Sequence, residues 1–523
     1  MNKRIVSMLL TFAMLIALFT GATAAFAEEV EYKDELHIGY KIEPAHLDTQ
    51  LIADAPPRVI AYGTIYEALV TMDGNFRVQP ELCESWEISE DAKTYTWYLR
   101  QGIKFHNGEE MTADDVVASM NRWLDHYSNA KNMVGEAKFE KVDDYTVQIV
   151  MENSAGMLNE LIATQTQGSV IMPKSVLEDL DPETGRIKQY IGTGPYTFGE
   201  WKEGSYIRLD RYEDYQPYGV KGEASGWYGY KTQLSKHIFY EFVADVTVRT
   251  SGIQTGEFDI VTEMNNDDYA MFQSIEGLNT YKDLNGLYFI VYNKKEGLCA
   301  DVNIRQAVNA VANPTEIMAT ALGNPDFYRP EISWMPEEMS DWYTDAGKEN
   351  AHLMDNELAK EYMEKAGYDG TPLRILLPSN NYNLMNAGVA LKSELEAAGF
   401  TVELVTPDWT SYSSYRNDST KYDMFFSCAM PVTVPTFYQF LGSSYAGFTN
   451  DQNIFDQAAI INQTADLATA QKLWDEMQTY CWTESLPVTK LGTMFIFNVY
   501  SDDVVDFQFF SSGPIAANIG VKK

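Results

Sequence analysis

The sequence has few positively charged residues for its length of 523, because 39 Lys and Arg stand against 75 Asp and Glu and give a formal net charge of −36. A chain this negative repels a phosphate backbone, and no Lys/Arg-rich run offsets that repulsion locally. Binding to nucleic acid is therefore not expected. Glycine (34) and proline (19) occur at ordinary frequencies, which excludes a collagen-like or linker-like chain.

Cysteine and histidine are also scarce. The four cysteines are Cys83, Cys299, Cys428 and Cys481. Their long, irregular spacing contains no C-x-x-C pair, so a zinc site is not expected, while one disulfide and four free thiols both fit the spacing. The six histidines are scattered and never stand four residues apart on one helix, which favours structural or surface roles. We expect neither a metal nor a cofactor.

Motifs of hydrolases and of nucleotide-binding proteins are missing. There is no G-x-S-x-G nucleophile elbow, no H-E-x-x-H zinc-peptidase motif and no G-x-x-x-x-G-K-[ST] phosphate loop. Gly192-Thr193-Gly194 begins like a dinucleotide fingerprint, but Thr197 stands where the third glycine is needed and Pro195 disfavours the helix that should open there. A non-catalytic protein is the main expectation, and a secreted hydrolase is the alternative from another class.

The only long apolar run lies at the N-terminus. Lys3 and Arg4 precede an uncharged stretch over residues 5–27 that ends in Ala25-Phe26-Ala27. A basic start, an apolar centre and an A-x-A end are the three parts of a secretory signal peptide, which predicts cleavage after Ala27. A retained membrane anchor is the alternative, because the stretch is long enough to span a bilayer. The stretch holds no cysteine for lipid attachment, so we expect a free exported protein, periplasmic or extracellular.

What the chain has in abundance is aromatic residues, with 33 Tyr, 25 Phe and 10 Trp, and such a composition is typical of a folded chain rather than a disordered one. Alternating apolar and polar residues predict strands at 36–40, 94–99, 103–105, 145–151, 206–209 and 238–242. Helical spacing predicts helices over 59–70 and from an N-cap at Thr112. Residues 373–405 read as a strand, a helix closed by Gly399 and a second strand. Together these patterns favour an α/β protein of two lobes, one of them enlarged.

Ordered sequence blocks then indicate a family. The blocks are Ile65–Leu69, Val78–Glu87, Tyr95–Gly108, Met111–Val116, Ile191–Tyr196, Gln254–Ile260, Asn293 and Asp301–Val308. In this order they closely resemble the family 5 extracellular solute-binding proteins, the peptide- and nickel-type receptors of ABC importers. One departure is Asn303, which stands where the family pattern has its first arginine.

The resemblance implies a bilobed periplasmic-binding-protein fold with an additional inserted domain, which closes about a hinge around its ligand. The expected division is a signal peptide at 1–27, lobe I at 28–60, 190–285 and 490–523, an inserted domain at 61–189, and lobe II at 286–489. Trp86, Trp97 and Phe105 are expected in the core of the inserted domain. Gly192, Gly194 and Pro195 are expected to shape the backbone near an inter-lobe crossing, and Arg305 to form a structural ion pair.

The resemblance also places the ligand, against the segments 47–55 and 427–433. The candidate ligand-binding residues are Ala53, Asp54, Ala55, Tyr288, Asn293, Trp334, Trp409, Ser427, Cys428, Ala429 and Met430. Peptide-binding members commonly carry a Trp and an Asp in the second segment, where the Asp pairs with the free amine of the peptide. This sequence has Ser427 and Met430 there by position, so Asp54 or another carboxylate would have to take that role.

Two ligand classes remain open at this point. A peptide or peptide-like molecule is the main expectation from the resemblance. An oligosaccharide or glycoside is the alternative, because Trp334, Trp409, Tyr412 and Tyr415 lie in loop-like stretches and aromatic faces stack on sugars. Nickel is disfavoured, since no group of histidines is apparent. The expected partner is a membrane-embedded ABC permease complex, and the protein itself is expected to be a monomer.

Overall fold

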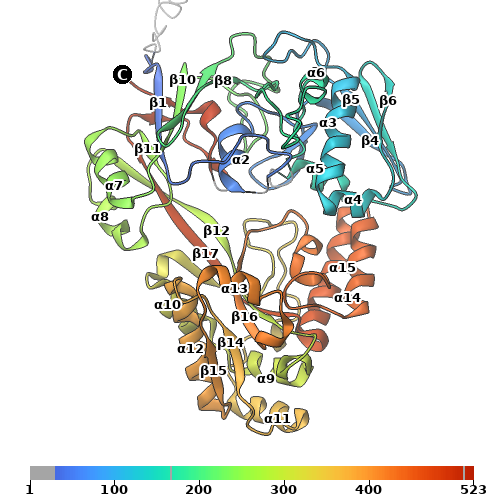
Figure 1. The fold of residues 1–523 in the computed structure, drawn as a ribbon, viewed down its shortest axis with the longest axis vertical. Coiled ribbons are helices and arrows are strands. Elements are labelled where there is room, and N and C mark those ends of the chain that lie inside the picture. The colour runs from blue at the N-terminus through green and yellow to red at the C-terminus, as the bar shows by residue number, and fades with distance from the viewer. Residues whose placement is uncertain (1–29, 53, 165–167, 511–512) are drawn as a thin grey trace, which may run out of the picture.

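Two long strands join the halves of the molecule. The computed structural model describes residues 30–52, 54–164, 168–510 and 513–523. Strands β12 (Leu278–Tyr292) and β17 (Val488–Ser501) pair antiparallel along almost their whole length and run from the upper half to the lower half in Figure 1. Because one backbone pair connects the halves, bending of these two strands would move one half relative to the other.

A single sheet extends through both halves, in the order β15-β14-β16-β12-β17-β11-β1-β10-β9-β8. We call the half containing β1 and β8–β11 lobe I and the half containing β14–β16 lobe II. The strands of lobe I are β1 (Glu35–Tyr40), β8 (Tyr196–Lys202), β9 (Tyr206–Arg211), β10 (His237–Phe242) and β11 (Ile260–Val261). The strands of lobe II are β14 (Leu373–Leu376), β15 (Val402–Val405) and β16 (Met424–Ala429), and β13 (Tyr328–Pro330) pairs with β17 beside this path. The strands predicted at 36–40, 206–209 and 238–242 are confirmed.

Lobe II contains the predicted strand–helix–strand unit. Strands β14 and β15 pair in parallel, and α12 (Tyr382–Ala398) connects them. Gly399 ends this helix with φ of +110°, a left-handed conformation that favours glycine. The other helices of this lobe are α9 (Val302–Val311), α10 (Pro314–Leu322), α11 (Asn356–Ala366), α13 (Trp409–Tyr415), α14 (Gln452–Gln463) and α15 (Leu467–Tyr480).

The inserted domain has its own sheet. Its strands are β4 (Cys83–Ile88), β5 (Thr94–Leu99), β6 (Phe139–Asp143) and β7 (Thr146–Val150), in the order β4-β5-β7-β6. Its helices are α3 (Ala113–His126), α4 (Ser128–Val134), α5 (Leu158–Ala163) and α6 (Lys174–Leu177). Thr112 and Asp115 form a capping box at the start of α3, as the sequence predicts. Trp97 and Phe105 are fully buried here and Trp86 is partly buried, so the predicted core residues are confirmed.

A buried cluster of charged residues connects the inserted domain to lobe I. Lys231 contacts Glu81 at 2.8 Å and Glu67 at 3.1 Å, and all three side chains are almost fully buried. Glu67 also accepts a hydrogen bond from Thr193, within the turn that contains Gly192 and Gly194. A side chain at Gly194 would place its Cβ 2.2 Å from the carbonyl oxygen of Thr64, so the turn needs glycine because two backbones approach closely. The turn therefore joins the inserted domain to lobe I rather than marking the crossing into lobe II.

Three local predictions are wrong. The helix expected over 59–70 is α2 (Ala55–Ala61), which ends early because Tyr62 is extended and Gly63 has φ of +72°. Residues 103–105 form only an isolated bridge between Lys104 and Glu110 instead of a strand. Arg305 makes no ion pair with any residue that the structure describes; instead it donates hydrogen bonds to backbone carbonyls, including those of Ser485 and Leu486.

The remaining helices are α7 (Val246–Thr255) and α8 (Tyr269–Gln273). The remaining strands are β2 (Val70–Met72), β3 (Val78–Pro80), β18 (Val504–Val505), β19 (Phe509–Phe510), β20 (Gly513–Pro514) and β21 (Gly520–Val521). All four cysteines lie in the described part of the chain and are free thiols. No helix within the described ranges is long and apolar enough to cross a membrane. The predicted signal peptide lies outside those ranges, and the predicted domain boundaries stay a prediction.

Candidate ligand-binding cleft

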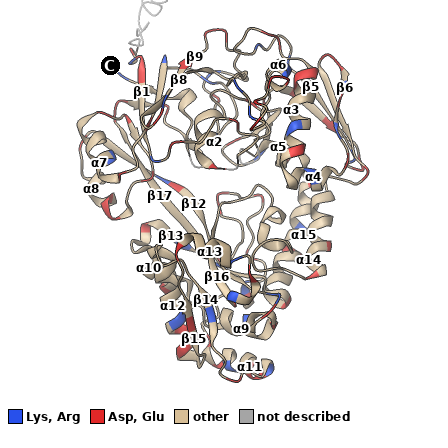
Figure 2. Ribbon diagram, in the orientation of Figure 1, with Lys and Arg blue, Asp and Glu red and all other residues tan. Residues whose placement is uncertain are grey.

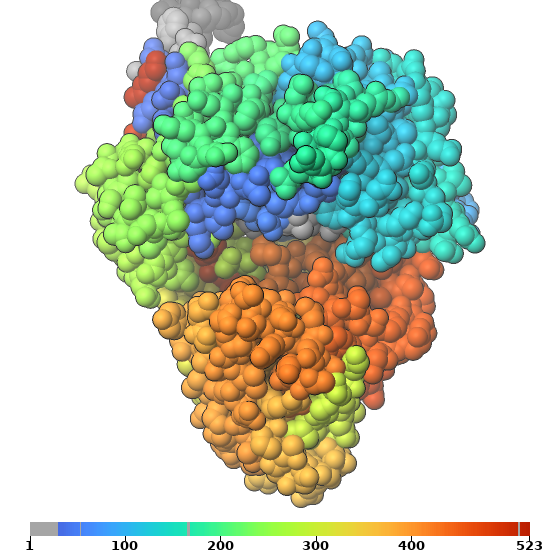
Figure 3. All heavy atoms as spheres, in the orientation of Figure 1, coloured from blue at the N-terminus to red at the C-terminus, as the bar shows by residue number. Residues whose placement is uncertain are grey.

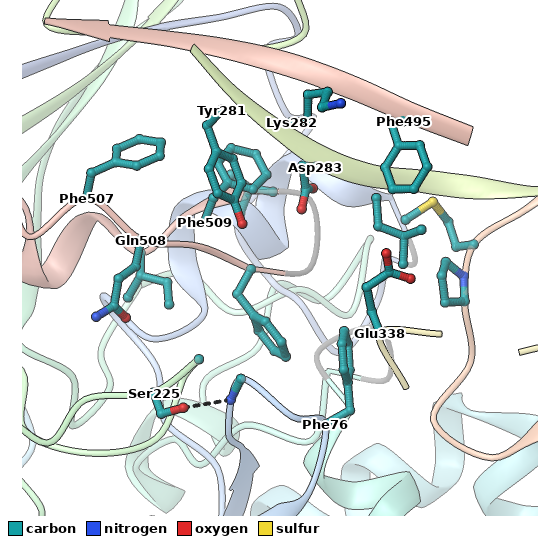
Figure 4. Close-up of a pocket in the computed structure, with 18 of the residues that line it drawn as sticks. Phe76, Ser225, Tyr281, Lys282, Asp283, Glu338, Phe495, Phe507, Gln508 and Phe509 are labelled. Carbon is teal, nitrogen blue, oxygen red and sulfur yellow. Dashed lines mark hydrogen bonds between the residues drawn. The ribbon is translucent and has the colours of Figure 1, made fainter. Parts of the chain in front are cut away.

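A cavity of about 560 Å³ lies beside the hinge, where the two lobes face each other. Lobe I contributes Ala55, Arg58 and residues 507–510, the hinge strands contribute residues 281–284 and Phe495, and lobe II contributes Glu338, Met430 and Pro431. Figure 3 shows the surface hollowed between the two halves, and Figure 4 shows side chains from both converging on this space. A molecule bound here would contact both lobes at once.

Aromatic rings form much of the wall of this hinge cavity. Tyr281 on β12 packs against Phe507 and Phe509, with ring centroids 5.6 Å and 5.8 Å apart. Phe76 lies in the turn between β2 and β3, and its ring centroid is 4.7 Å from that of Phe510. Such rings offer flat apolar surface and can also attract a cation through their faces.

Two carboxylates point into the hinge cavity, Asp283 from β12 and Glu338 from lobe II (Figure 4). Glu338 is paired with Arg329, whose guanidinium contacts both carboxylate oxygens at 2.9 and 3.0 Å and is shared with Glu331 and Glu337. Oδ2 of Asp283 is buried and has no hydrogen-bond partner among the described residues, although the residue as a whole is partly exposed. Burial raises the pKa of Asp283 to about 7, and the like charge of Glu338 adds to that rise.

The cleft continues away from the hinge through two further cavities. The second, of about 400 Å³, is lined by residues 427–433 and shares Arg58, Met430 and Pro431 with the hinge cavity. The third, of about 900 Å³, lies between the α4 region of the inserted domain and α14 of lobe II. The second and third share Ser128, Asn129, Phe437, Tyr438, Gln439 and Tyr445. Shared walls make the three cavities one groove, and we call the third cavity the outer groove.

Five of the predicted ligand-binding residues line this cleft. Ala55 lies on the wall of lobe I, and Ser427, Cys428, Ala429 and Met430 lie at the end of β16 in lobe II. Two segments that are far apart in sequence are thus brought to opposite sides of one cavity.

The other candidates from the first segment lie beside the cleft or outside the described ranges. Asp54 is the exposed N-cap residue of α2, next to the lining residue Ala55, and its carbonyl oxygen accepts a hydrogen bond from Nε of Arg58 at 3.0 Å. Ala53 is outside the residues that the structure describes.

Four further candidates lie outside the cleft walls. Tyr288 is buried on β12, opposite Cys428, and Trp334 is buried among Phe440, Trp474 and Trp482. The side-chain amide of Asn293 donates to the carbonyls of Ser419 and Tyr422 at 2.7 and 2.9 Å, which is a structural role. Trp409 is 48% exposed at the start of α13, so the loop predicted around it is a helix. Most of the aromatic surplus in this lobe therefore belongs to its core.

Sequence reasoning missed the residues that give the hinge cavity its chemistry. These are Arg58, Phe76, Tyr281, Asp283, Glu338, Phe495, Phe507, Phe509 and Phe510. The aromatic repeat Phe507-Gln508-Phe509-Phe510 is the one local signal that could have drawn attention to this region. Asp283 carries no such signal, because only the folding of lobe II against lobe I encloses it.

The family model described as bacterial extracellular solute-binding proteins, family 5, matches residues 77–477. The chain belongs to this family. Among curated relatives of this family 5 protein, a probable peptide ABC transporter periplasmic-binding protein of Sinorhizobium fredii is 28% identical over 375 residues, which cover 69% of this chain and 68% of the relative. The dipeptide-binding protein of Escherichia coli is 26% identical over 411 residues, covering 69% of this chain and 71% of the relative.

Solved structures show the same fold. The substrate-binding protein CtaP of Listeria monocytogenes superposes with a TM-score of 0.80 at 20% identity, covering 94% of this chain and 100% of that one. The protein AgaA of A. tumefaciens, solved with agropinic acid, superposes with a TM-score of 0.74 at 24% identity, covering 94% and 99%. The chain therefore has the bilobed, three-domain α/β fold that the sequence predicts for a family 5 member.

Proposed function

We propose that this family 5 solute-binding protein captures a peptide or peptide-like molecule between its lobes and delivers it to an ABC permease complex. The observation that carries the proposal is the hinge cavity, whose walls come from lobe I, from the two crossing strands and from lobe II. Contacts from both lobes are complete only when the lobes are close together, so a bound ligand stabilises the closed arrangement.

The chemistry of the cleft supports a peptide over the alternatives. The aromatic wall suits apolar side chains, and Asp283 suits a protonated amine. Curated relatives at 24–28% identity carry names such as oligopeptide-binding and dipeptide-binding protein. The residues that we assign to ligand contact from the sequence-predicted set are Ala55, Ser427, Cys428, Ala429 and Met430, with Asp54 at the rim.

The same proposal covers the place and mode of action. The protein is exported, with its signal peptide removed after Ala27, and acts as a monomeric carrier rather than as an enzyme. Acidic residues are distributed over both lobes in Figure 2, as suits a receptor that stays dissolved outside the cell. The membrane permease supplies the transport step, because the chain has no phosphate-binding loop of its own.

Mass spectrometry of the natively purified protein tests the proposal, followed by thermal-shift assays with a panel of peptides and a panel of oligosaccharides. A ligand at a hundredfold excess over its dissociation constant stabilises the folded state by about 2.7 kcal/mol, which gives a clear shift. We expect shifts with peptides. Shifts with oligosaccharides alone would support the glycoside alternative, and no shift in either panel would contradict the proposal.

A pair of matched variants locates the site. Met430→Trp places a large ring where the hinge cavity meets the second cavity, and it should abolish the peptide shift. Met271→Trp makes the same change at an exposed position on α8, outside the cleft, and should leave the shift unchanged. Equal shifts in both variants would place the ligand elsewhere.

A further inference from the structure

Charge is unevenly distributed along the groove. The hinge cavity is lined by Arg58, Lys282, Asp283 and Glu338, whereas every residue that lines the outer groove is uncharged. The outer groove is rich in side-chain amides and hydroxyls, which come from Ser128, Asn129, Asn132, Asn153, Ser154, Thr436, Gln439, Ser444, Asn462 and Gln463. In a chain with a net charge of −36, a cavity of about 900 Å³ with no charged side chain among its described wall residues differs clearly from the rest of the protein.

We infer that the cleft binds an elongated ligand in one orientation, with a protonated amine held by Asp283 at the hinge end and an uncharged chain extending toward the outer groove. The inference deepens the proposed function, on which it rests, by naming the end of the ligand that is recognised and the residue that recognises it.

Asp283 is placed to accept such a group. It lies on β12 opposite Ile496 of β17, in the hinge pair itself, and its carboxylate points into the hinge cavity (Figure 4). Its Oδ2 is buried and lacks a hydrogen-bond donor among the described residues. An unpaired buried acceptor is unfavourable, so a ligand that supplies a donor to this carboxylate removes that penalty on binding.

The charged residues that line the cavity with Asp283 form their contacts with other residues. Glu338 faces it from lobe II but is bonded to Arg329, and that guanidinium also lies over the ring of Phe495 at 5.2 Å. Lys282 points to the opposite side of the strand in Figure 4, where its Nζ lies 3.4 Å from the carbonyl oxygen of Asp326. Arg58 donates from Nε to the backbone of Asp54 on lobe I. None of these contacts neutralises Asp283.

The surroundings of Asp283 favour an organic cation over a hydrated ion. Tyr281 and Phe76 present aromatic surface to the same space, so an amine attached to an apolar body would be enclosed by rings. The amides of the outer groove, at the other end, both donate and accept hydrogen bonds, which suits peptide groups but leaves a charged terminus without a counter-ion. The hinge cavity therefore suits the amine end of a ligand, and the outer groove suits its uncharged end.

Calorimetric titration of matched peptides tests the inference. The best-bound member of a pool of tri- to pentapeptide amides is prepared with a free amine and with an N-acetyl group, and both forms are titrated into wild type, Asp283→Asn and Asp54→Asn. A charge-assisted hydrogen bond supports a preference of roughly 10- to 100-fold for the free amine in wild type. We expect Asp283→Asn to remove that preference by binding the free amine less tightly, and a cooperative melting transition shows separately that the variant is folded.

The other outcomes are distinct. Equal binding of both forms by wild type, or loss of the preference in Asp54→Asn but not in Asp283→Asn, would overturn the inference and leave the proposed function standing. Failure of wild type to bind any member of the pool would overturn the proposed function itself.

Discussion

Arg77 and Asp341 lie 264 positions apart in the chain and form a two-point ion pair, with Nε 2.9 Å from Oδ2 and Nη2 3.0 Å from Oδ1. Arg77 follows the cleft residue Phe76, and Asp341 belongs to lobe II. Two longer hydrogen bonds also join the inserted domain to lobe II: the hydroxyl of Thr433 donates to the carbonyl oxygen of Glu160, and the backbone N–H of Met157 donates to the carbonyl oxygen of Asn462, both at 3.3 Å. These bonds can form only when this side of the upper half lies against lobe II, as it does in the structure.

The first prediction concerns the ion pair between Arg77 and Asp341. Arg77→Ala should weaken ligand binding by a few-fold at most, because the pair is exposed and exposed ion pairs contribute little. The change should appear mainly in the dissociation rate, measured by stopped-flow fluorescence at low salt, and should shrink as salt rises. Arg211→Ala, in an exposed pair within lobe I, is the control and should change neither rate. If Arg77→Ala changed the dissociation rate more at high salt than at low salt, an electrostatic role for this pair would be contradicted.

The second prediction follows from the raised pKa of Asp283. The folded chain keeps this proton up to about pH 7, whereas the unfolded chain loses it near pH 4. Since the folded state binds more protons at this group in that window, the contribution of Asp283 to the stability of ligand-free protein should fall as pH rises from about 4 to about 7. Asp283→Asn has no titrating group at this position, so the melting temperature of the variant should rise relative to that of wild type as pH increases through this window.

Differential scanning fluorimetry at several pH values measures this gain. Glu160 and Glu394 have their pKa values raised to about 7 in the same way, but they remain in both proteins and cancel in the comparison. A difference in melting temperature that stays constant with pH would show that Asp283 does not titrate in this window.

The third prediction concerns the buried cluster between lobe I and the inserted domain. Lys231→Met leaves Glu67 and Glu81 buried without their cation, which should cost about 3–5 kcal/mol of unfolding free energy. Lys360→Met, in an exposed pair with Glu357, is the matched control and should stay within about 0.5 kcal/mol of wild type. Chemical denaturation measures both, and equal losses in the two variants would contradict the role assigned to the cluster.

The fourth prediction separates core rings from ligand rings. Trp334→Ala should destabilise the protein by about 3–5 kcal/mol, because the side chain is fully buried against other rings of lobe II. Trp409→Ala should have little effect on stability, since that ring is half-exposed. Neither residue lines the cleft, so calorimetry should find unchanged ligand affinity in the folded fraction of both variants. A large loss of affinity in Trp409→Ala would place a ligand contact outside the cleft described above.

Local sequence signals predicted those parts of the fold that local physics determines. The strand–helix–strand unit ending at Gly399 and the capping box at Thr112 depend on periodicity and end-capping within a few residues. The helix predicted over 59–70 ends at Ala61, where Tyr62 is extended and Gly63 takes a φ of +72° close to the ring of Trp227, a residue far away in sequence. The sequence holds no local trace of such a contact.

The same distinction applies to the cleft. The segment 427–430 was found because the family resemblance points to it, and it lies at the end of β16 against the cleft. Asp283 and the rings around it were missed because β12 is half-exposed along its first part and becomes a cleft wall only when lobe II folds against lobe I. Enclosure by a second lobe is a property of the tertiary fold.

The most direct test of capture between the lobes is small-angle X-ray scattering of the purified, ligand-free protein, titrated with a peptide that calorimetry has shown to bind. Ligand-stabilised closure predicts that the radius of gyration falls and levels off at one peptide per protein, and that Met430→Trp shows no such fall. A radius of gyration that stays constant while calorimetry shows the peptide to be bound would contradict the account.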